Sequence, residues 1–353
     1  MATPKFAAAL GAVLVALLTF LTSRTYAAVA ASSTPGESNR TEILFLGTAG
    51  GPPLRLDRSE PSTLLIVDGR RYLIDCGIGT MRRMLRAGVK SEQVRTIFFT
   101  HLHADHDLGL ADVMANDFFR QNVAGRREPI QIYGPPQTRE LVDAAFSFIT
   151  VGFRPFENLP PPTNGKFASP FVTHEVERDG VIFQDDKIRV TAAENSHYAL
   201  MPPDRGKGFK SYSYRIETPH GVIVFTGDTG PSEAVERLAK GADVLVAEAN
   251  TRDAQDVDKA TAAMAAQSHW TPAHAKAFSA HFEVEHLDTD KVGRLARDAE
   301  VKAVLLYHYV PENRFDQAAY VTGVRKSFSG PVFAPDDLDR YCLAAGSLAR
   351  CAN

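Results

Sequence analysis

Cysteine is scarce in this chain, with only three among its 353 residues. So few cysteines exclude a fold that depends on a disulfide framework. Cys76 ends the apolar run Leu73-Ile74-Asp75-Cys76-Gly77, which predicts a buried thiol. Cys342 and Cys351 flank a short C-terminal segment; in an oxidising compartment they could pair and tie it down. The sequence leaves pairing and free thiols equally open.

Long runs of lysine and arginine are absent as well. The 39 basic residues are outnumbered by 42 acidic ones, which gives a formal net charge of −3. Nothing in this pattern indicates a nucleic-acid-binding surface. Hydrophobic residues make up 44% and charged residues 23%, proportions typical of a globular protein with a substantial core.

The first thirty residues differ in kind from the rest. Lys5 supplies a positive start, Phe6 to Leu21 is almost wholly apolar, and Ala28-Val29-Ala30 offers a signal-peptidase site. The apolar run is slightly short for a membrane-spanning helix of ~20 residues. We therefore expect residues 1–30 to be a signal peptide, cleaved after Ala27 or Ala30, and no stable membrane anchor afterwards.

Export would place the mature protein in the periplasm or outside the cell. Because the signal peptide contains Lys5 and Arg24 and no acid, its removal takes the formal charge from −3 to −5. Residues 31–40 are expected to be a flexible leader, 41–340 the main domain and 341–353 a C-terminal tail.

The main domain alternates strand-like and helix-like segments, which predicts an α+β fold of two packed sheets with helices outside. Strands are predicted at Ile43 to Leu46, Leu64 to Val67, Tyr72 to Ile74, Thr96 to Phe99, Ile130 to Tyr133, Ile188 to Ala192, Tyr212 to Glu217, Val222 to Phe225, Val244 to Ala247 and Val304 to Tyr307. Helices are predicted at Met81 to Ala87, Leu108 to Gln121, Ser232 to Ala239, Asp290 to Glu300 and Gln317 to Ser327. Phe153 to Pro170 should be a loop, and Ala254 to Phe282 a helical segment that could cover a site.

Three of the eleven histidines lie within six residues, in Thr100-His101-Leu102-His103-Ala104-Asp105-His106. This run follows a predicted strand. Alternate side chains converge in an extended loop, so His101 and His103 can share one metal ion while Asp105 and His106 reach a second. Such ligands suit zinc, and also manganese or iron. A histidine-rich polar loop without metal is the much weaker alternative.

Further ligands must come from the second half of the chain, and three candidates stand there at the ends of predicted strands. They are His197, Asp228, which lies in a glycine turn, and His308. Because all three candidates stand at strand ends, residues far apart in sequence could meet at one edge of a sheet.

The His-Leu-His-Ala-Asp-His run, with Thr226-Gly227-Asp228-Thr229 and Leu305-Leu306-Tyr307-His308 downstream, resembles the metallo-β-lactamase superfamily. The branch it resembles most contains ribonuclease Z, the type III arylsulfatases and the class II cyclic-nucleotide phosphodiesterases. The similarity covers about residues 42–310 and includes the segments Phe45 to Pro53, Leu73 to Gly77, Ala247 to Asn250 and His286 to Asp290.

This resemblance implies a four-layer αββα sandwich with two zinc ions. One ion would be held by His101, His103 and His197, a second by Asp105, His106 and His308, and Asp228 would bridge both. A hydroxide between the ions would be the nucleophile, oriented or deprotonated by Asp105. Glu248 would orient His286, which would protonate the leaving group. His281 lies only five residues before His286, but the helix start at Asp288 favours His286.

Features of this sequence argue against several members of the superfamily. Lactamases with a cysteine ligand need a thiol between His197 and His308, where this chain has none. We expect no tRNA partner, because of the signal peptide, the acidic mature charge and the short stretch from His197 to Asp228. That stretch leaves no room for a long tRNA-gripping arm.

What remains is an exported hydrolase of small anionic esters, with a phosphodiester or an aryl sulfate as substrate. A carboxylic ester, thioester or lactone is the alternative, and a non-catalytic metal-binding protein is an alternative of another class. Arg205, Lys207 and Lys210 could attract an anionic substrate or form a solvated loop. Dimers are common in the branch, so a homodimer is expected by analogy alone.

Overall fold

The computed structural model describes residues 39–51, 54–124, 128–156, 169–202, 208–310 and 315–351. The predicted signal peptide lies outside these residues, as does most of the leader. Within the described ranges, no helix is both long and apolar enough to cross a bilayer.

Fifteen strands in the described residues form two mixed sheets, which confirms the α+β expectation. The first sheet has the order β15-β14-β1-β2-β3-β4-β5-β6, with strands β1 (Thr41–Gly47), β2 (Ser62–Val67), β3 (Arg70–Ile74), β4 (Val94–Phe98), β5 (Ile130–Gly134), β6 (Phe171–Glu175), β14 (Arg340–Ala344) and β15 (Ser347–Arg350). The second has the order β13-β12-β11-β10-β9-β8-β7, with strands β7 (Gly180–Gln184), β8 (Arg189–Glu194), β9 (Tyr212–Thr218), β10 (Gly221–Phe225), β11 (Val244–Glu248), β12 (Ala303–Tyr307) and β13 (Val332–Phe333).

Three apolar clusters between the layers hold the sandwich together. In β1, Ile43 and Phe45 face the second sheet, while Leu44 and Leu46 face the outer helices. This alternation follows from the two-residue period of a strand, and it requires a wholly apolar strand when both faces are buried. β11 in the second sheet shows the same alternation, with one face packed against the first sheet and the other against the outer helices.

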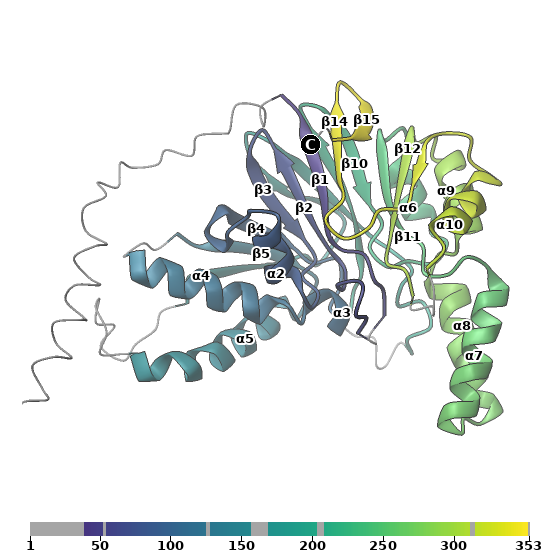
Figure 1. Ribbon diagram of the computed structural model, residues 1–353, viewed down its shortest axis with the longest axis horizontal. Helices are drawn as coiled ribbons and strands as arrows, with labels where there is room; N and C mark the ends of the chain where they lie inside the picture. The colour runs from purple at the N-terminus through teal and green to yellow at the C-terminus, as the bar shows by residue number, and fades with distance from the viewer. Residues whose placement is uncertain are drawn as a thin grey trace, which may run out of the picture. The chain divides into compact units, whose positions relative to one another are not determined.

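Helices cover the outer face of each sheet, so the fold has four layers (Figure 1). The first sheet is covered by α2 (Thr80–Arg86), α4 (Leu110–Ala124) and α5 (Thr138–Phe153). The second is covered by α6 (Glu233–Ala239), α9 (Thr289–Asp298) and α10 (Gln317–Arg325). The predicted αββα sandwich is thus confirmed.

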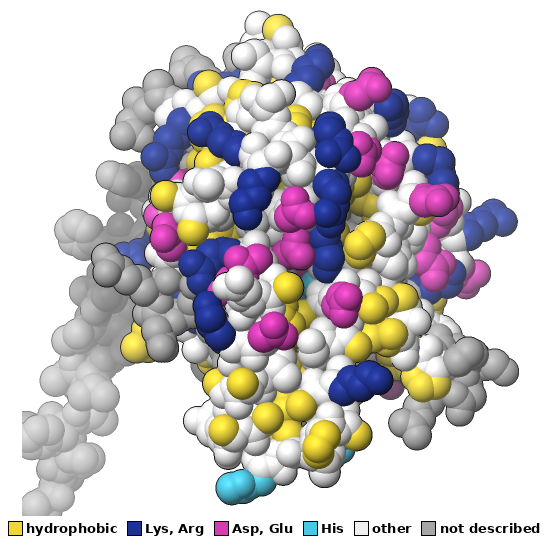
Figure 2. Space-filling model, turned by 90° about the vertical axis from the view of Figure 1, so that its right-hand side faces the viewer, with side chains coloured by type: hydrophobic (Ala, Val, Ile, Leu, Met, Phe, Trp, Pro, Cys, Tyr) yellow, Lys and Arg dark blue, Asp and Glu magenta, His cyan; other side chains and the backbone are white. Residues whose placement is uncertain are grey.

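The Ala-rich segment forms two helices rather than one continuous helix. α7 (Ala254–Ser268) ends at His269, whose backbone is left-handed with φ 51°. α8 (Pro272–Glu285) then begins with Thr271 as its N-cap and proline in its first turn, a common helix start. The two helices form a hairpin that stands off the sandwich, with many exposed side chains (Figures 1 and 2).

The structure revises two predictions, the loop at Phe153 to Pro170 and the C-terminal tail at 341–353. Phe153 is the last residue of α5, and a short helix, η2 (Arg154–Phe156), follows it, so the predicted loop starts later; residues 157–168 lie outside the described ranges. At the other end, the segment predicted as a tail contributes β14 and β15, and β14 pairs with β1. A disulfide joins Cys342 to Cys351 across this hairpin, and Cys76 is a buried free thiol.

Candidate metal centre

The histidine-rich run follows the carboxyl end of β4 in the first sheet and enters a single helical turn, α3 (Ala104–Asp107). His103 caps this turn in an extended conformation (φ −84°, ψ 149°). The backbone therefore changes from extended to helical within the run. This change brings His101, His103, Asp105 and His106 to neighbouring positions around one point.

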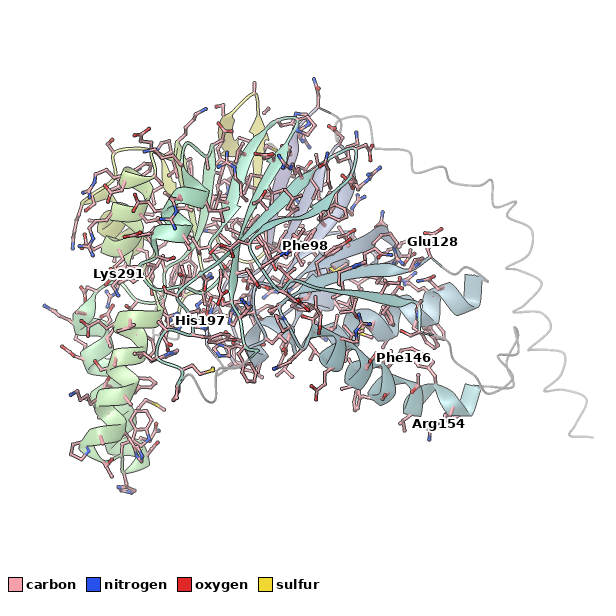
Figure 3. The ribbon with its side chains drawn as sticks, turned by 180° about the vertical axis from the view of Figure 1, so that it is seen from behind. Phe98, Glu128, Phe146, Arg154, His197 and Lys291 are labelled. Carbon is pink, nitrogen blue, oxygen red and sulfur yellow. A yellow bond between two sulfur atoms is a disulfide. The ribbon has the colours of Figure 1, made fainter. Side chains whose placement is uncertain are left out.

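The second sheet presents its ligand candidates at a single edge. β10, β11 and β12 are parallel, and β8 has the same direction because β9 is antiparallel to both β8 and β10. His197, Asp228, Glu248 and His308 lie at or just after the carboxyl ends of these four strands. Figure 3 shows His197 beside the base of the α7–α8 hairpin.

Two groups of three side chains without Asp228 form where the edges of the sheets meet, and three further groups contain Asp228, one of them with His197 and His286. In each group, one ligand atom per residue lies within 4.8 Å of the others. The first group is His101, His103 and His197; the second is Asp105, His106 and His308. Asp228 lies between them, with its carboxylate oxygens 3.0 Å from His308 Nε2, 3.4 Å from His106 Nε2 and 3.9 Å from His101 Nε2.

Neighbouring groups fix how the histidines are oriented. Asp75 accepts hydrogen bonds from His106 Nδ1 (2.9 Å) and from the backbone N–H of Thr100 (2.8 Å). The carbonyl oxygen of Glu285 accepts from His197 Nδ1 (3.0 Å). These bonds turn Nε2 of both histidines toward the centre, as metal-binding histidines require; His106 Nε2 has no hydrogen-bond partner, and His197 Nε2 lies 3.0 Å from His103 Nδ1.

The cluster fits divalent cations, because several buried polar atoms in it have no hydrogen-bond partner. These atoms are His101 Nε2, His106 Nε2 and Asp228 Oδ1. Leaving such atoms unpaired in the protein interior is costly, and a coordinated ion would satisfy them. Burial also lowers the pKa of His101, and that of His197 to about 4, which keeps both imidazoles neutral as ligands must be.

The other half of the cluster attracts positive charge. Burial alone would lower the pKa of His308, but the carboxylates of Asp228 and Asp105 raise it to about 10. Asp228 is almost fully buried, yet His308 and His106 hold its pKa well below the usual range. Negative charge thus concentrates at the point where the two groups meet.

The loop that follows β1 passes close to Asp105 and His308 at the metal centre. Gly51 donates its backbone N–H to Asp105 Oδ2 at 3.0 Å. A Cβ at Gly50 would lie 2.3 Å from His308 Nδ1. Only glycine allows the backbone to pass so near the imidazole.

Glu248 and His286 form a buried pair next to the cluster. Glu248 Oε2 lies 2.7 Å from His286 Nδ1, and Glu248 Oε1 accepts from the backbone N–H of Thr229 at 2.5 Å. Burial raises the pKa of Glu248, with a further contribution from Asp228, and burial lowers that of His286. His286 Nδ1 is 3.9 Å from Asp228 Oδ2, so the pair adjoins the centre.

Three further residues contact the site: Asp75 and Tyr198, which the sequence did not single out, and His281, which was weighed only as an alternative to His286. Asp75 orients His106, Tyr198 places its ring 5.3 Å from that of His103, and His281 faces His286. Asp75 follows an apolar strand, which is the signal that singled out Asp228. The other histidines, 174, 220, 269 and 274, are in none of the ligand groups formed by the described residues.

The basic loop after His197 is only partly described. Lys210 pairs with Glu194 at 2.5 Å. Arg205 and Lys207 lie outside the described residues.

Comparison with known proteins identifies relatives across most of the chain. A family model for the beta-lactamase superfamily domain matches residues 70–309. Ribonuclease Z of Methanothermobacter thermautotrophicus is 30% identical over 307 residues, which cover 76% of this chain and 86% of that protein.

Solved structures share the fold at lower identity. The metallo-β-lactamase fold protein YhfI from Bacillus subtilis has a TM-score of 0.61 and 16% identity, and covers 86% of this chain and 100% of its own. The short form of human tRNase Z has a TM-score of 0.57 and 21% identity, and covers 85% of this chain and 98% of its own.

These relatives contradict the expectation that tRNA is no partner, since their names describe ribonuclease Z and tRNase Z enzymes. Besides the predicted signal peptide, the expectation relied on net charge and on the length of one segment. Net charge sums over the whole surface and does not report the charge near a site. Neither feature can therefore exclude an RNA substrate.

Proposed function

Since this chain belongs to the metallo-β-lactamase superfamily, in its ribonuclease Z-like branch, we propose that it cleaves phosphodiester bonds with the aid of two zinc ions. The protein is a metal-dependent hydrolase that acts on ester bonds. The two ligand groups joined by Asp228 support a pair of ions. His101, His103 and His197 would hold one ion, and Asp105, His106 and His308 the other.

The bound ions would supply two effects, a lower pKa of a coordinated water and stabilisation of developing negative charge. Asp105, which His106 and His308 keep ionised despite its burial, would orient the attacking water. Asp228 would fix the spacing of the two ligand groups. These roles divide the carboxylates between binding and positioning.

The Glu248–His286 pair is the observation that carries the choice of bond. His286 is placed next to Asp228 and held by Glu248, as a proton donor to a leaving group should be. General-acid catalysis matters most when the leaving group is a poor one. An alkoxide leaving from a phosphodiester, such as a ribose oxygen, needs a proton more than the phenolate of an aryl sulfate does.

A side-by-side substrate panel tests the proposal. The purified protein is assayed for zinc by elemental analysis, then with a dinucleotide, a 3′-extended tRNA precursor, an aryl sulfate and a lactone. We expect about two zinc ions per chain and turnover of the phosphodiesters, with Asp228→Ala as the inactive control. Turnover of the lactone alone would favour a carboxylic ester hydrolase. No turnover of any substrate by the fully zinc-loaded protein would favour a non-catalytic metal-binding protein.

We also propose that the protein is exported to the periplasm or secreted. The positive start at Lys5, the apolar run and the small residues at 28–30 support a cleaved signal. The disulfide between Cys342 and Cys351 is of a kind that persists in oxidising compartments. Intact-mass measurement of the protein from fractionated cells should show an N-terminus after Ala27 or Ala30; an uncleaved cytosolic chain would contradict export.

A further inference from the structure

A second glutamate–histidine pair contacts the first beside the metal centre. His281 lies on the last turns of α8, and its Nδ1 is 2.7 Å from Glu285 Oε2. Its Nε2 is 3.1 Å from His286 Nε2. The four side chains thus form one chain of contacts, Glu248–His286–His281–Glu285, with a carboxylate at each end.

Hydrogen bonds hold Glu285 and the turn that follows it in place. Glu285 is buried, and its Oε1 accepts the backbone N–H of Leu200 at 2.7 Å. Its carbonyl oxygen accepts from His197 Nδ1. The carbonyl of His286 accepts from Lys291 Nζ at 3.1 Å, which fixes the turn between α8 and α9 (Lys291 is labelled in Figure 3). His281 is therefore built into the site rather than resting near it.

Hydrogen-bond accounting places one proton between the two imidazoles. His281 Nδ1 donates its N–H to the Glu285 carboxylate, and one proton lies between His286 Nδ1 and Glu248 Oε2. A nitrogen–nitrogen contact of 3.1 Å is a hydrogen bond only if one of the two Nε2 atoms carries a hydrogen. The three contacts of the chain then hold three protons, and the middle one lies between the two imidazoles, beside the metal centre.

We propose that His281 is a second catalytic imidazole, which shares with His286 the proton passed to the leaving group. The inference rests on the proposed phosphodiesterase function. As the bond between phosphorus and the leaving oxygen breaks, that oxygen takes the shared proton, and both Nε2 atoms are left bare. The attacking water releases one proton to solvent as its oxygen bonds to phosphorus, and one proton returns from solvent through His281, whose side chain is 36% exposed, whereas that of His286 is 6% exposed.

Leaving-group dependence tests this role. His281→Ala should slow cleavage of a dinucleotide, whose leaving group is an alkoxide, by roughly tenfold to a hundredfold. A p-nitrophenyl phosphodiester should lose much less, because its leaving group needs little protonation. His274→Ala is the matched control, since His274 is an exposed histidine on the same helix. Equal loss on both substrates, or no loss on either, would overturn the proposal.

A double-mutant cycle asks whether the two imidazoles act as one unit. If they share the proton, His281→Ala combined with His286→Ala should be no slower than His286→Ala alone. Independent, multiplying losses would show that His281 acts elsewhere.

Nuclear magnetic resonance of protein labelled with ¹⁵N-histidine separates this inference from the proposed function. His281→Ala should shift the ring-nitrogen resonances of His286, while His274→Ala should not. If the wild type cleaves no phosphodiester but this shift is present, the imidazole pair stands and the substrate assignment fails. If the shift is absent in an active enzyme, the shared proton is wrong and the function stands.

Discussion

At the residue scale, His286 and Asp228 differ in what they offer a metal ion. Both belong to groups that could hold one, but His286 Nδ1 is already bonded to Glu248 at 2.7 Å. Asp228 Oδ1 has no hydrogen-bond partner. We infer that Asp228 binds metal and that His286 transfers a proton.

His286→Ala should therefore keep both ions and slow turnover of a phosphodiester by roughly 10²–10⁴. Elemental analysis and steady-state kinetics on the same preparation give both quantities. Asp228→Ala provides the contrast, because it should lower metal content to one ion or none. Loss of metal from His286→Ala would contradict the separation of ligand from acid.

Glu60 is a buried carboxyl group, and His106 is the positively charged side chain that opposes its protonation. Burial raises its pKa from 4.5 to about 7, the carboxylates of Asp105 and Asp107 add to this, and the N–H of Ile78 opposes it. Between pH 4.5 and 7 the unfolded chain ionises this group while the folded chain keeps it protonated. Folding is then disfavoured increasingly as the pH rises through this window.

Glu60→Gln should remove that penalty, since a glutamine oxygen can still accept the N–H of Ile78. The metal-free variant should match the wild type near pH 4.5 and exceed it by roughly 1–3 kcal/mol above pH 7, at ~1.4 kcal/mol per pKa unit. Urea unfolding at the two pH values measures the difference. A gain of equal size at both would assign the effect to packing.

Sequence reasoning found the residues that end apolar strands but missed those that support them. His197 and His308 stand out because a polar residue directly follows a buried strand. Asp75 also follows one, but its role depends on Thr100 and His106, 25 and 31 residues away. Such contacts exist only once the sheets pack together, and no local pattern records them.

At the element scale, the strands that escaped prediction are the edge strands β6, β7, β13 and β15, together with β14, which lies between β15 and β1. β7 has no fully buried residue, and β6 has alternate residues exposed. An edge strand pairs with only one neighbour, so it needs fewer apolar residues than a central one. The central strands β1, β10, β11 and β12 are apolar on both faces or nearly so, and all were predicted.

The disulfide ties β15 to β14, whereas β14 is also held by burial of Tyr341 and Leu343 in the core. β15 has no buried residue. Cys342→Ser with Cys351→Ser should lower the free energy of unfolding by about 2–3 kcal/mol, the value expected for closing so short a loop. Turnover should persist, because Cys342 pairs with Glu42 at the start of β1, away from Gly50 and the metal centre. Urea unfolding with and without reductant tests this: reductant should weaken the wild type and leave the variant unchanged.

At the scale of the whole molecule, the metal centre joins the two sheets. The first sheet supplies His101, His103, Asp105 and His106, and the second supplies His197, Asp228 and His308. The apolar core between the sheets brings these edges together. An unfolded chain cannot gather ligands spread over two hundred positions, so the free energy of metal binding adds to the stability of the fold.

Chelation should therefore lower the melting temperature of the entire domain, not of one loop. Free zinc at a hundred times its dissociation constant stabilises a folded protein by about 2.7 kcal/mol, a shift of several degrees that calorimetry resolves. His286→Ala should retain this zinc-dependent shift, and Asp228→Ala should lose most of it. If zinc stabilised Asp228→Ala as much as the wild type, the ions would not be bridged by this carboxylate, and the two ligand groups would have to bind metal independently.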